Sequence, residues 1–399
     1  MPRSSSRGQV LILAASQAIF QTASVLVVTV GSLSAAQIAG SPALATMPVA
    51  TMVLGTALAT VPASMWMNRV GRRPGFVTGA LLGVAGGLLA ALGVLVGSLA
   101  LLCLGTLLVG SWQGFAQFYR FAASEVCSEK FRSRAISYVL AGGIVAAFAG
   151  PFLGKLGEPL FEPGYLGSFL LLAVVALLGV GLLMSLRIPP PDTNEAKGGG
   201  RPWREIVTQP AYMVALFGAA TGGGVMTLAM TATPLAMAGH DHSLSSTATV
   251  IQLHVLGMFV PSFFSGPLIA RFGALPVMLA GVLVLAGHVL ITLNGTSFGS
   301  FAAALALLGV GWNFLYVGGT TLLTTTYTKA EKGRAQATND MTIFVVGVIC
   351  SFGAGLLLDD LGWVALNLVT LPWLAVAALA LLWHAVRTRG GNVRADFRR

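Results

Sequence analysis

The stretch Asn68-Arg-Val-Gly-Arg-Arg73 links two long apolar segments and carries three arginines in six residues. A shorter version of it, Arg271-Phe-Gly273, follows another apolar segment about 200 residues further along the chain. At the same offset, Met52-Val-Leu-Gly-Thr56 returns as His254-Val-Leu-Gly-Met258. Repetition on this scale indicates a duplicated architecture in which both halves contain the same set of elements.

Apolar residues dominate the whole chain. Of its 399 residues, 55% are hydrophobic and 9% are charged, whereas a soluble domain carries about 25% charged residues. A membrane-spanning helix needs about 20 apolar residues. Twelve such segments can be drawn, at residues 10–33, 43–66, 76–96, 99–121, 135–154, 165–186, 209–238, 246–270, 275–293, 298–325, 335–358 and 363–385. The sequence therefore predicts an all-α polytopic protein with 12 transmembrane helices in the lipid bilayer.

The basic residues predict the orientation of the chain. They occur in alternate loops and at both ends, as Arg3, Arg7, Arg69, Arg72, Arg73, Lys130, Arg132, Arg134, Arg187, Lys197, Arg201, Arg204, Arg271, Lys329, Lys332, Arg334 and the arginines from 387 to 399. The opposite loops contain Lys155 alone. Because Lys and Arg favour cytoplasmic loops, we expect both termini in the cytoplasm. This pattern accounts for the net charge of +10, and no nucleic-acid partner is predicted.

The longest polar stretch divides the chain into two groups of six predicted spans. It holds Pro189-Pro-Pro191 and Gly198-Gly-Gly200, a composition typical of flexible linkers. We predict an N-terminal six-helix bundle at 1–186, a cytoplasmic linker at 187–208, and a C-terminal six-helix bundle with a short basic tail at 209–399. No larger extramembrane domain is expected, which argues against a non-transporting membrane sensor or assembly factor. The sequence contains no nucleophile–base or carboxylate pair at a plausible depth, so an enzyme is not predicted.

The loop at 68–73 resembles the signature G-x-x-x-D-R-x-G-R-R of major facilitator transporters, which joins their second and third spans. The resemblance implies a gating loop made of Asn68, Arg69, Gly71, Arg72 and Arg73. This chain has Asn68 where the family has Asp, which weakens the charge network expected of that loop. Membership implies two six-helix bundles that work by alternating access, with the substrate near the midplane between them.

Two pairs of soft ligands lie inside predicted spans. Met226 and Met230 are four residues apart in the seventh span, and His254 and Met258 are four apart in the eighth. That spacing places each pair on one helix face, and thioethers with an imidazole suit copper. Counted from the external ends of their helices, the two pairs lie at similar depths of roughly 12 to 20 Å. The alternative is that the methionines fill core space and His254 is a polar contact between helices.

The paired motifs Met-x-x-x-Met and His-x-x-x-Met resemble those of CcoA-like copper importers, a branch of the major facilitators. The resemblance implies a bacterial inner-membrane importer of Cu(I) or Cu(II), with Met226, Met230, His254 and Met258 as ligands. It would act as a monomer and supply cytoplasmic copper carriers for assembly of cbb3-type cytochrome c oxidase. Copper would be the transported substrate, and no permanently bound cofactor is expected. Relatives without the motifs carry organic solutes such as riboflavin, and that is the alternative function.

Further polar residues have two interpretations each. His240, Asp241 and His242 lie in the external loop above the two methionine pairs, either as a capture point for metal or as a solvated turn. Met52, the repeat counterpart of His254, is either a pathway contact or core packing. Asp340, near the cytoplasmic end of the eleventh span, either carries a coupling proton or pairs with an arginine of the gating loops.

Overall fold

The computed structural model describes residues 6–127, 135, 138–139, 141–188, 200–328 and 331–396. Within these ranges the regular structure is entirely helical. The first half contains α1 (Ser6–Ala39), α2 (Pro42–Ala45), α3 (Met47–Val70), α4 (Arg72–Leu95), α5 (Leu99–Ala116), α6 (Tyr119–Glu125), α8 (Gly142–Gly157) and α9 (Leu166–Met184). The second half contains α10 (Trp203–Val207), α11 (Pro210–Ala238), α12 (Leu244–Phe259), α13 (Ser262–Phe272), α14 (Ala274–Thr292), α15 (Phe298–Thr324), α16 (Lys332–Leu368) and α17 (Leu371–Asp396).

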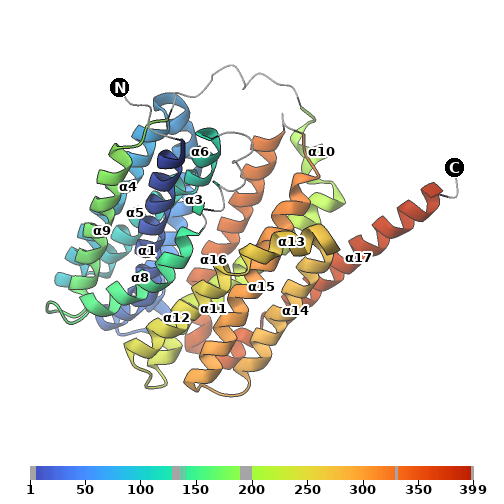
Figure 1. The fold of residues 1–399 in the computed structure, drawn as a ribbon. Helices are drawn as coiled ribbons and strands as arrows, with labels where there is room; N and C mark the ends of the chain where they lie inside the picture. Colours follow the sequence, from blue (N-terminus) through green and yellow to red (C-terminus); the bar gives the residue numbers. More distant parts are fainter. Residues whose placement is uncertain are drawn as a thin grey trace.

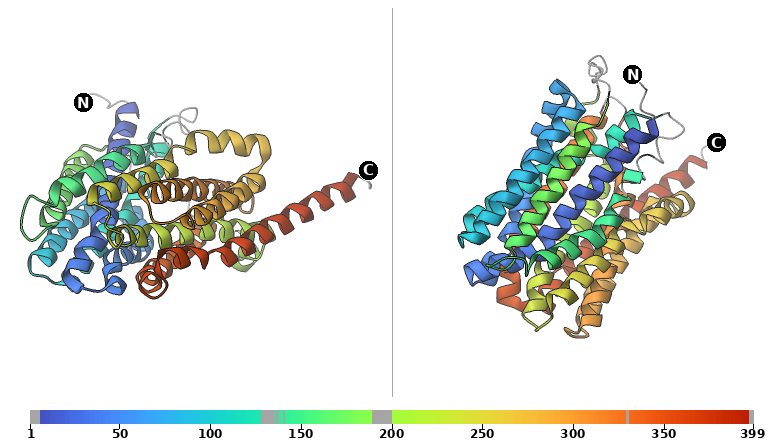
Figure 2. Two further views of the ribbon diagram at one scale, coloured as in Figure 1. Left: turned by 90° about the horizontal axis from the view of Figure 1, so that it is seen from below. Right: turned by 60° about the vertical axis from the view of Figure 1, so that its left-hand side comes forward.

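The helices form two groups, blue to green for the first half and yellow to red for the second (Figure 1). Figure 2 shows the same grouping from two further directions. In the described residues, ten helical stretches are long and apolar enough to cross a membrane. The stretch Arg334–Thr388 contains the last two predicted spans, and the shorter apolar helix α8 corresponds to the fifth. The prediction of an all-α polytopic membrane protein is thus confirmed.

The internal repeat has a structural counterpart in two glycine turns. Gly71 lies between α3 and α4 with φ 92° and ψ 166°, and Gly273 lies between α13 and α14 with φ 89° and ψ 162°. Positive φ is strained for a residue with a Cβ atom, so each turn favours glycine. The same residue therefore makes the same connection in both halves, as the matching Arg-x-Gly patterns suggested.

A proline divides one predicted span, and a glycine kink lies at the junction between two others. Pro261 lies between α12 and α13, where its missing N–H ends the helical hydrogen-bond ladder and divides the eighth span. The side-chain amide of Asn313 donates to the Met258 carbonyl at 2.8 Å beside this break. Gly362, with φ 75° and ψ 175°, bends α16. The predicted tail is helical as far as Asp396, and this part of α17 extends beyond the other helices (Figures 1 and 2).

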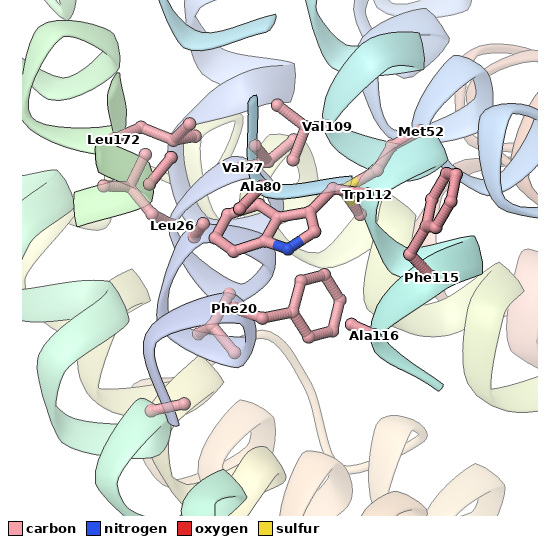
Figure 3. Packing of buried hydrophobic residues seen from close by; sticks show 14 of the residues in the cluster. Phe20, Leu26, Val27, Met52, Ala80, Val109, Trp112, Phe115, Ala116 and Leu172 are labelled. Carbon is pink, nitrogen blue, oxygen red and sulfur yellow. The ribbon is translucent and has the colours of Figure 1, made fainter. Parts of the chain in front are cut away.

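The second half has a hydrophobic core of its own, and the core of the first half also includes Ile251 and Val255 of α12. In the first half the fully buried Trp112 of α5 packs edge-on against Phe20 of α1, with ring centroids 5.3 Å apart (Figure 3). A Cβ atom on Gly83 of α4 would collide with the Trp112 ring, so glycine lets α4 and α5 approach closely. The packing of Trp112 holds Phe20 in place, and Phe20 also lines the cavity between the halves.

Part of the predicted linker is ordered against the second half. The range 187–208 includes the short helix α10, which the linker composition did not predict. Arg201 donates from Nε and Nη2 to the buried Glu331 carboxylate at 2.9 and 2.8 Å, and its backbone N–H donates to the same group at 2.8 Å. These contacts hold the pKa of Glu331 well below its ordinary value and raise that of Arg201.

Several residues named in the sequence analysis lie outside the described residues: Arg3, Lys130, Arg132, Arg134, Pro189 to Pro191, Lys197, Gly198, Gly199, Lys329, Arg398 and Arg399.

The two halves touch where α8 packs on α12 and where α2 and α3 pack on α16. Near one end of the contact between α8 and α12, the Lys155 ammonium of α8 donates to the Ser245 hydroxyl of α12 at 2.9 Å. Further along, a Cβ atom on Gly143 of α8 would collide with the Phe259 ring of α12. These contacts enclose one side of the space between the halves.

Candidate functional site: a polar cavity between the two halves

A cavity of about 360 Å³ lies between the halves and receives side chains from both. Its size falls in the range of small-molecule binding sites, roughly 300 to 1,000 Å³. The residues that line it are Gln17, Phe20, Gln21, Ser24, Val25, Val28, Val49, Met52, Val53, Thr56, Gln113, Gln117, Arg120 and Val139 from the first half, and Gly223, Met226, Thr227, Met230, Thr231, Val255, Met258, Phe259, Ser262, Trp312, Asn313, Tyr316, Val317, Asp340, Ile343, Phe344 and Gly347 from the second.

Four glutamine amides form the polar part of the wall in the first half. Gln17 and Gln21 are four residues apart on α1, and Gln113 and Gln117 are four apart at the end of α5, so each pair shares one helix face. The Gln113 Oε1 atom lies 3.1 Å from the Thr56 hydroxyl of α3. These amides were not among the site residues predicted from the sequence, although paired glutamines inside an apolar span are a readable signal because buried amides are costly without partners.

Aromatic rings provide flat surfaces in the same cavity. Trp312 and Tyr316 are stacked on α15 with their centroids 4.9 Å apart and their planes at 11°. Phe20 enters from α1, Phe259 from α12 and Phe344 from α16. The cavity thus combines flat apolar faces with amide donors and acceptors, which is the pattern of a site for a polar aromatic molecule.

Charged groups from opposite halves face this cavity. Arg120 of α6 donates from Nη1 to the Tyr316 hydroxyl of α15 at 3.5 Å, and its guanidinium lies 4.9 Å from the Phe121 ring centroid. Asp340 of α16 also lines the cavity, and its Oδ1 atom accepts a hydrogen bond from the Asn339 amide at 3.1 Å. An ionisable group inside a membrane span is costly, and it usually marks a site of function.

The four methionines named from the sequence all line the cavity. Met52 comes from α3, Met226 and Met230 from α11, and Met258 from α12. On α11 the cavity face runs through Gly223, Met226, Thr227, Met230 and Thr231, which follows the helical repeat. The thioethers are the residues in this wall that could hold a soft metal ion.

His254 does not join them. Its side chain is fully buried, it is absent from the cavity wall, and its Nδ1 atom bonds to the Leu305 carbonyl of α15 at 2.9 Å. Nδ1 must carry the proton to donate to a carbonyl, so the neutral ring leaves Nε2 without a proton, and Nε2 has no hydrogen-bond partner among the described residues. The expected four-residue ligand set is therefore not brought together, and His254 serves as a polar contact between α12 and α15.

The histidines of the predicted capture loop are held by local contacts. A ring nitrogen of His240 bonds to the Ala236 carbonyl at 2.7 Å, and one of His242 bonds to the Thr296 carbonyl at 2.7 Å. Both rings also contact Phe301, and Asp241 adopts a φ of 59° in the turn. None of the three residues lines the cavity.

The predicted gating loop lies at the α3–α4 connection. Arg69 and Arg73 are exposed, and the Arg72 guanidinium lies 5.6 Å from the centroid of the Phe118 ring. Gly71 makes the turn between the two helices. The side chain of Asn68 lies outside the described part of the structure.

Comparison with known proteins places this geometry in a family. The model of the Major Facilitator Superfamily matches residues 11–261 and 223–398. The chain is 39% identical over 380 residues to the riboflavin transporter RfnT of Brucella anthropi, which covers 94% of this chain and 96% of the relative. It is 30% identical over 380 residues to the uncharacterized MFS-type transporter YdeG of Bacillus subtilis, covering 91% and 87% of the two chains.

A solved structure shares the fold. The crystal structure of a bacterial homolog of the human lysosomal transporter Spinster, in an inward-facing and occupied conformation, has a TM-score of 0.74 to this chain at 15% identity. The match covers 96% of this chain and 98% of the other. With its helical bundle, its duplicated glycine turns and these relatives, the chain belongs to the major facilitator superfamily of transporters.

Proposed function

We propose that this protein imports a flavin, with riboflavin as its substrate, across the bacterial inner membrane by alternating access. The observation that carries the proposal is the composition of the cavity wall, where stacked aromatic rings stand beside four glutamine amides. Riboflavin has a flat three-ring system with polar edges and a chain of hydroxyl groups. Rings would stack on the flat part, and amides would bond to the edges and hydroxyls.

Sequence similarity supports the same substrate class. The relative RfnT is named a riboflavin transporter, and the alignment with it covers almost the full length of both chains. A shared binding cavity is the simplest reason for two chains of this similarity to carry the same solute.

The contacts between the halves support a rocking mechanism. The cavity is built from both halves, so binding a solute there connects them through Arg120, Tyr316 and the glutamines. Lys155 and Ser245 bond across the contact of α8 with α12, and the orientation predicted from the basic loops would place this contact on the external side. Rocking would break this contact and expose the cavity outward.

Copper import is the second candidate, and one observation favours it. Met52, Met226, Met230 and Met258 line the cavity from both halves, and thioethers bind Cu(I). Against it stands His254, whose ring is buried between α12 and α15 and absent from that wall. Without the imidazole, the cavity contains mostly amides, aromatic rings and aliphatic groups around the methionines. The flavin proposal accounts for more of the wall than copper does.

One experiment separates the two candidates. A bacterial strain that neither makes nor imports riboflavin would express the wild type, Gln113→Leu or Met230→Leu, with the protein in the membrane quantified. We expect the wild type to restore growth at low riboflavin, Gln113→Leu to impair uptake several-fold, and Met230→Leu to remain active. Uptake of isotopic copper would stay at the level of the empty vector. Copper accumulation that depends on Met230, with no riboflavin uptake, would reverse the assignment.

A further inference from the structure

Arg120 has more hydrogen-bonding capacity than the protein uses. A guanidinium carries five N–H donors, and the one acceptor recorded for it among the described residues is the Tyr316 hydroxyl, at the long distance of 3.5 Å. Its Nε atom is buried and has no hydrogen-bond partner in the part of the chain that the structure describes. A buried cation with unused donors is unfavourable unless another molecule supplies acceptors. The cavity beside it is the place where such a molecule can bind.

Asp340 presents the complementary group from the other half. Its Oδ1 atom accepts from Asn339, and the structure gives its Oδ2 atom no hydrogen-bond donor among the described residues. Within the same part of the chain, no nitrogen of Arg120 comes within 4 Å of an oxygen of Asp340, so the two charges are not an ion pair. Both groups line the same cavity, Arg120 from the first half and Asp340 from the second. The space between them therefore suits a ligand edge that carries both acceptors and a donor.

The pyrimidine-dione ring of a flavin has such an edge. It presents a carbonyl, an imide N–H and a second carbonyl in a row, which is an acceptor–donor–acceptor pattern. Arg120 can donate to a carbonyl, and the Asp340 carboxylate can accept from the imide N–H. The Trp312 and Tyr316 rings are stacked, and the Tyr316 hydroxyl contacts Arg120. These rings therefore offer a flat surface next to Arg120 on which the face of the flavin ring can stack.

We propose that Arg120 and Asp340 bind the imide edge of the flavin from opposite halves of the transporter and so set its specificity. This inference rests on the proposed function, because it assigns residues to the same substrate. Binding the edge would give each partly buried charge a partner and join α6 to α16 through the substrate. Solutes without an imide N–H would leave the Asp340 carboxylate unpaired in the occupied cavity.

The test compares riboflavin with 3-methylriboflavin, in which a methyl group replaces the imide hydrogen and both carbonyls remain. Binding to purified full-length protein in lipid nanodiscs is measured by the quenching of flavin fluorescence. We expect the wild type to bind the methylated compound at least roughly tenfold more weakly, the usual cost of losing a hydrogen bond to a charged group. Asp340→Ala should bind both compounds with similar affinity, and Arg120→Lys should weaken both by a similar factor while preserving the preference.

Matched controls and separate outcomes make the result decisive. Asp360→Ala changes an exposed acid on the same helix, and Arg204→Lys changes an exposed arginine, so both should bind like the wild type. Equal affinity of the wild type for the two flavins, or a preference that survives in Asp340→Ala, overturns the inference and leaves riboflavin transport standing. If Asp340→Ala does not fold, Asp340→Asn and the wild-type comparison still decide. Failure of the wild type to bind riboflavin at all overturns the proposed function and this inference together.

Discussion

The Nη1 atom of Arg120 lies 3.5 Å from the hydroxyl of Tyr316, so a polar contact joins α6 of the first half to α15 of the second inside the cavity. The Tyr316 ring is itself stacked on Trp312. Replacing tyrosine with phenylalanine keeps the stacking and removes the hydroxyl. In Tyr316→Phe we expect riboflavin affinity to fall roughly 2- to 10-fold, the usual effect of one hydrogen bond. Tyr165→Phe, outside the cavity, is the control, and unchanged affinity in Tyr316→Phe would contradict a role for this contact.

His254 should contribute to the stability of the folded protein and not to substrate binding or transport. Its ring fills a fully buried site between α12 and α15 and bonds to the Leu305 carbonyl. His254→Ala should therefore lower the free energy of unfolding by roughly 2–4 kcal/mol through the cavity it leaves. Thermal unfolding in detergent measures this, with the exposed His240→Ala as the milder control. Folded His254→Ala protein should keep the wild-type affinity for riboflavin, and a specific loss of binding without a loss of stability would refute this assignment.

The Arg201–Glu331 pair should make stability depend on acid. Arg201 and the Thr328 N–H lower the pKa of Glu331 from its ordinary value of 4.5. The Glu331 side chain therefore stays ionised to a lower pH in the folded protein than in the unfolded chain. Its contribution is thus complete above about pH 4.5 and is lost as the pH falls towards the lowered value. Comparing wild type with Glu331→Gln, the difference in melting temperature should be constant from neutral pH down to about pH 5 and shrink below it.

Glu205→Gln is the matched control for that comparison, since it removes an exposed acid from α10. Its melting temperature should follow the wild type at each pH. A difference between wild type and Glu331→Gln that persists unchanged in acid would show that the ion pair is not its source.

Close approach of α3 and α5 should make Gly110 intolerant of a side chain. A Cβ atom there would collide with the Met52 carbonyl oxygen. Gly110→Ala should then destabilise the protein by roughly 1–3 kcal/mol, as overpacking does, and reduce the folded protein extracted from membranes. Gly181→Ala, where a Cβ atom meets nothing within 4 Å, should behave like the wild type. Equal yields for the two variants would mean that α3 and α5 separate easily.

Cross-linking of Lys155 to Ser245 tests alternating access. Their side chains bond across the contact of α8 with α12. With Cys103, Cys127 and Cys350 replaced by alanine, the double variant Lys155→Cys with Ser245→Cys would be treated with a short bifunctional thiol reagent. Uptake should stop and should return on reduction if the reagent contains a disulfide. Each single-cysteine variant should stay active after the same treatment, and uptake that continues in the cross-linked double variant would rule out rocking about this contact.

The helical fold could be read from the sequence because hydrocarbon leaves the backbone no other partners. A span of about 20 apolar residues must satisfy its own N–H and C=O groups, and only a helix does so within one segment. The repeated Arg-x-Gly pattern was visible in the sequence, and the structure gives its local reason, since the backbone has positive φ at both Gly71 and Gly273. The break at Pro261 also has a local cause, although the eighth segment was drawn without it. The ordered α10 was missed, because Arg201 finds Glu331 only after folding.

The composition of the site was decided by how each helix is rotated in the tertiary structure. On α12 the cavity face runs through Val255, Met258 and Phe259. His254 lies four residues before Met258, only about 40° around the helix, yet it falls behind the edge of that face and turns to Leu305. The sequence determined that His254 and Met258 are neighbours on α12. The rotation of α12 was set by the backbone contact at Gly309, where a Cβ atom would strike the His254 carbonyl, and such packing joins residues far apart in the chain.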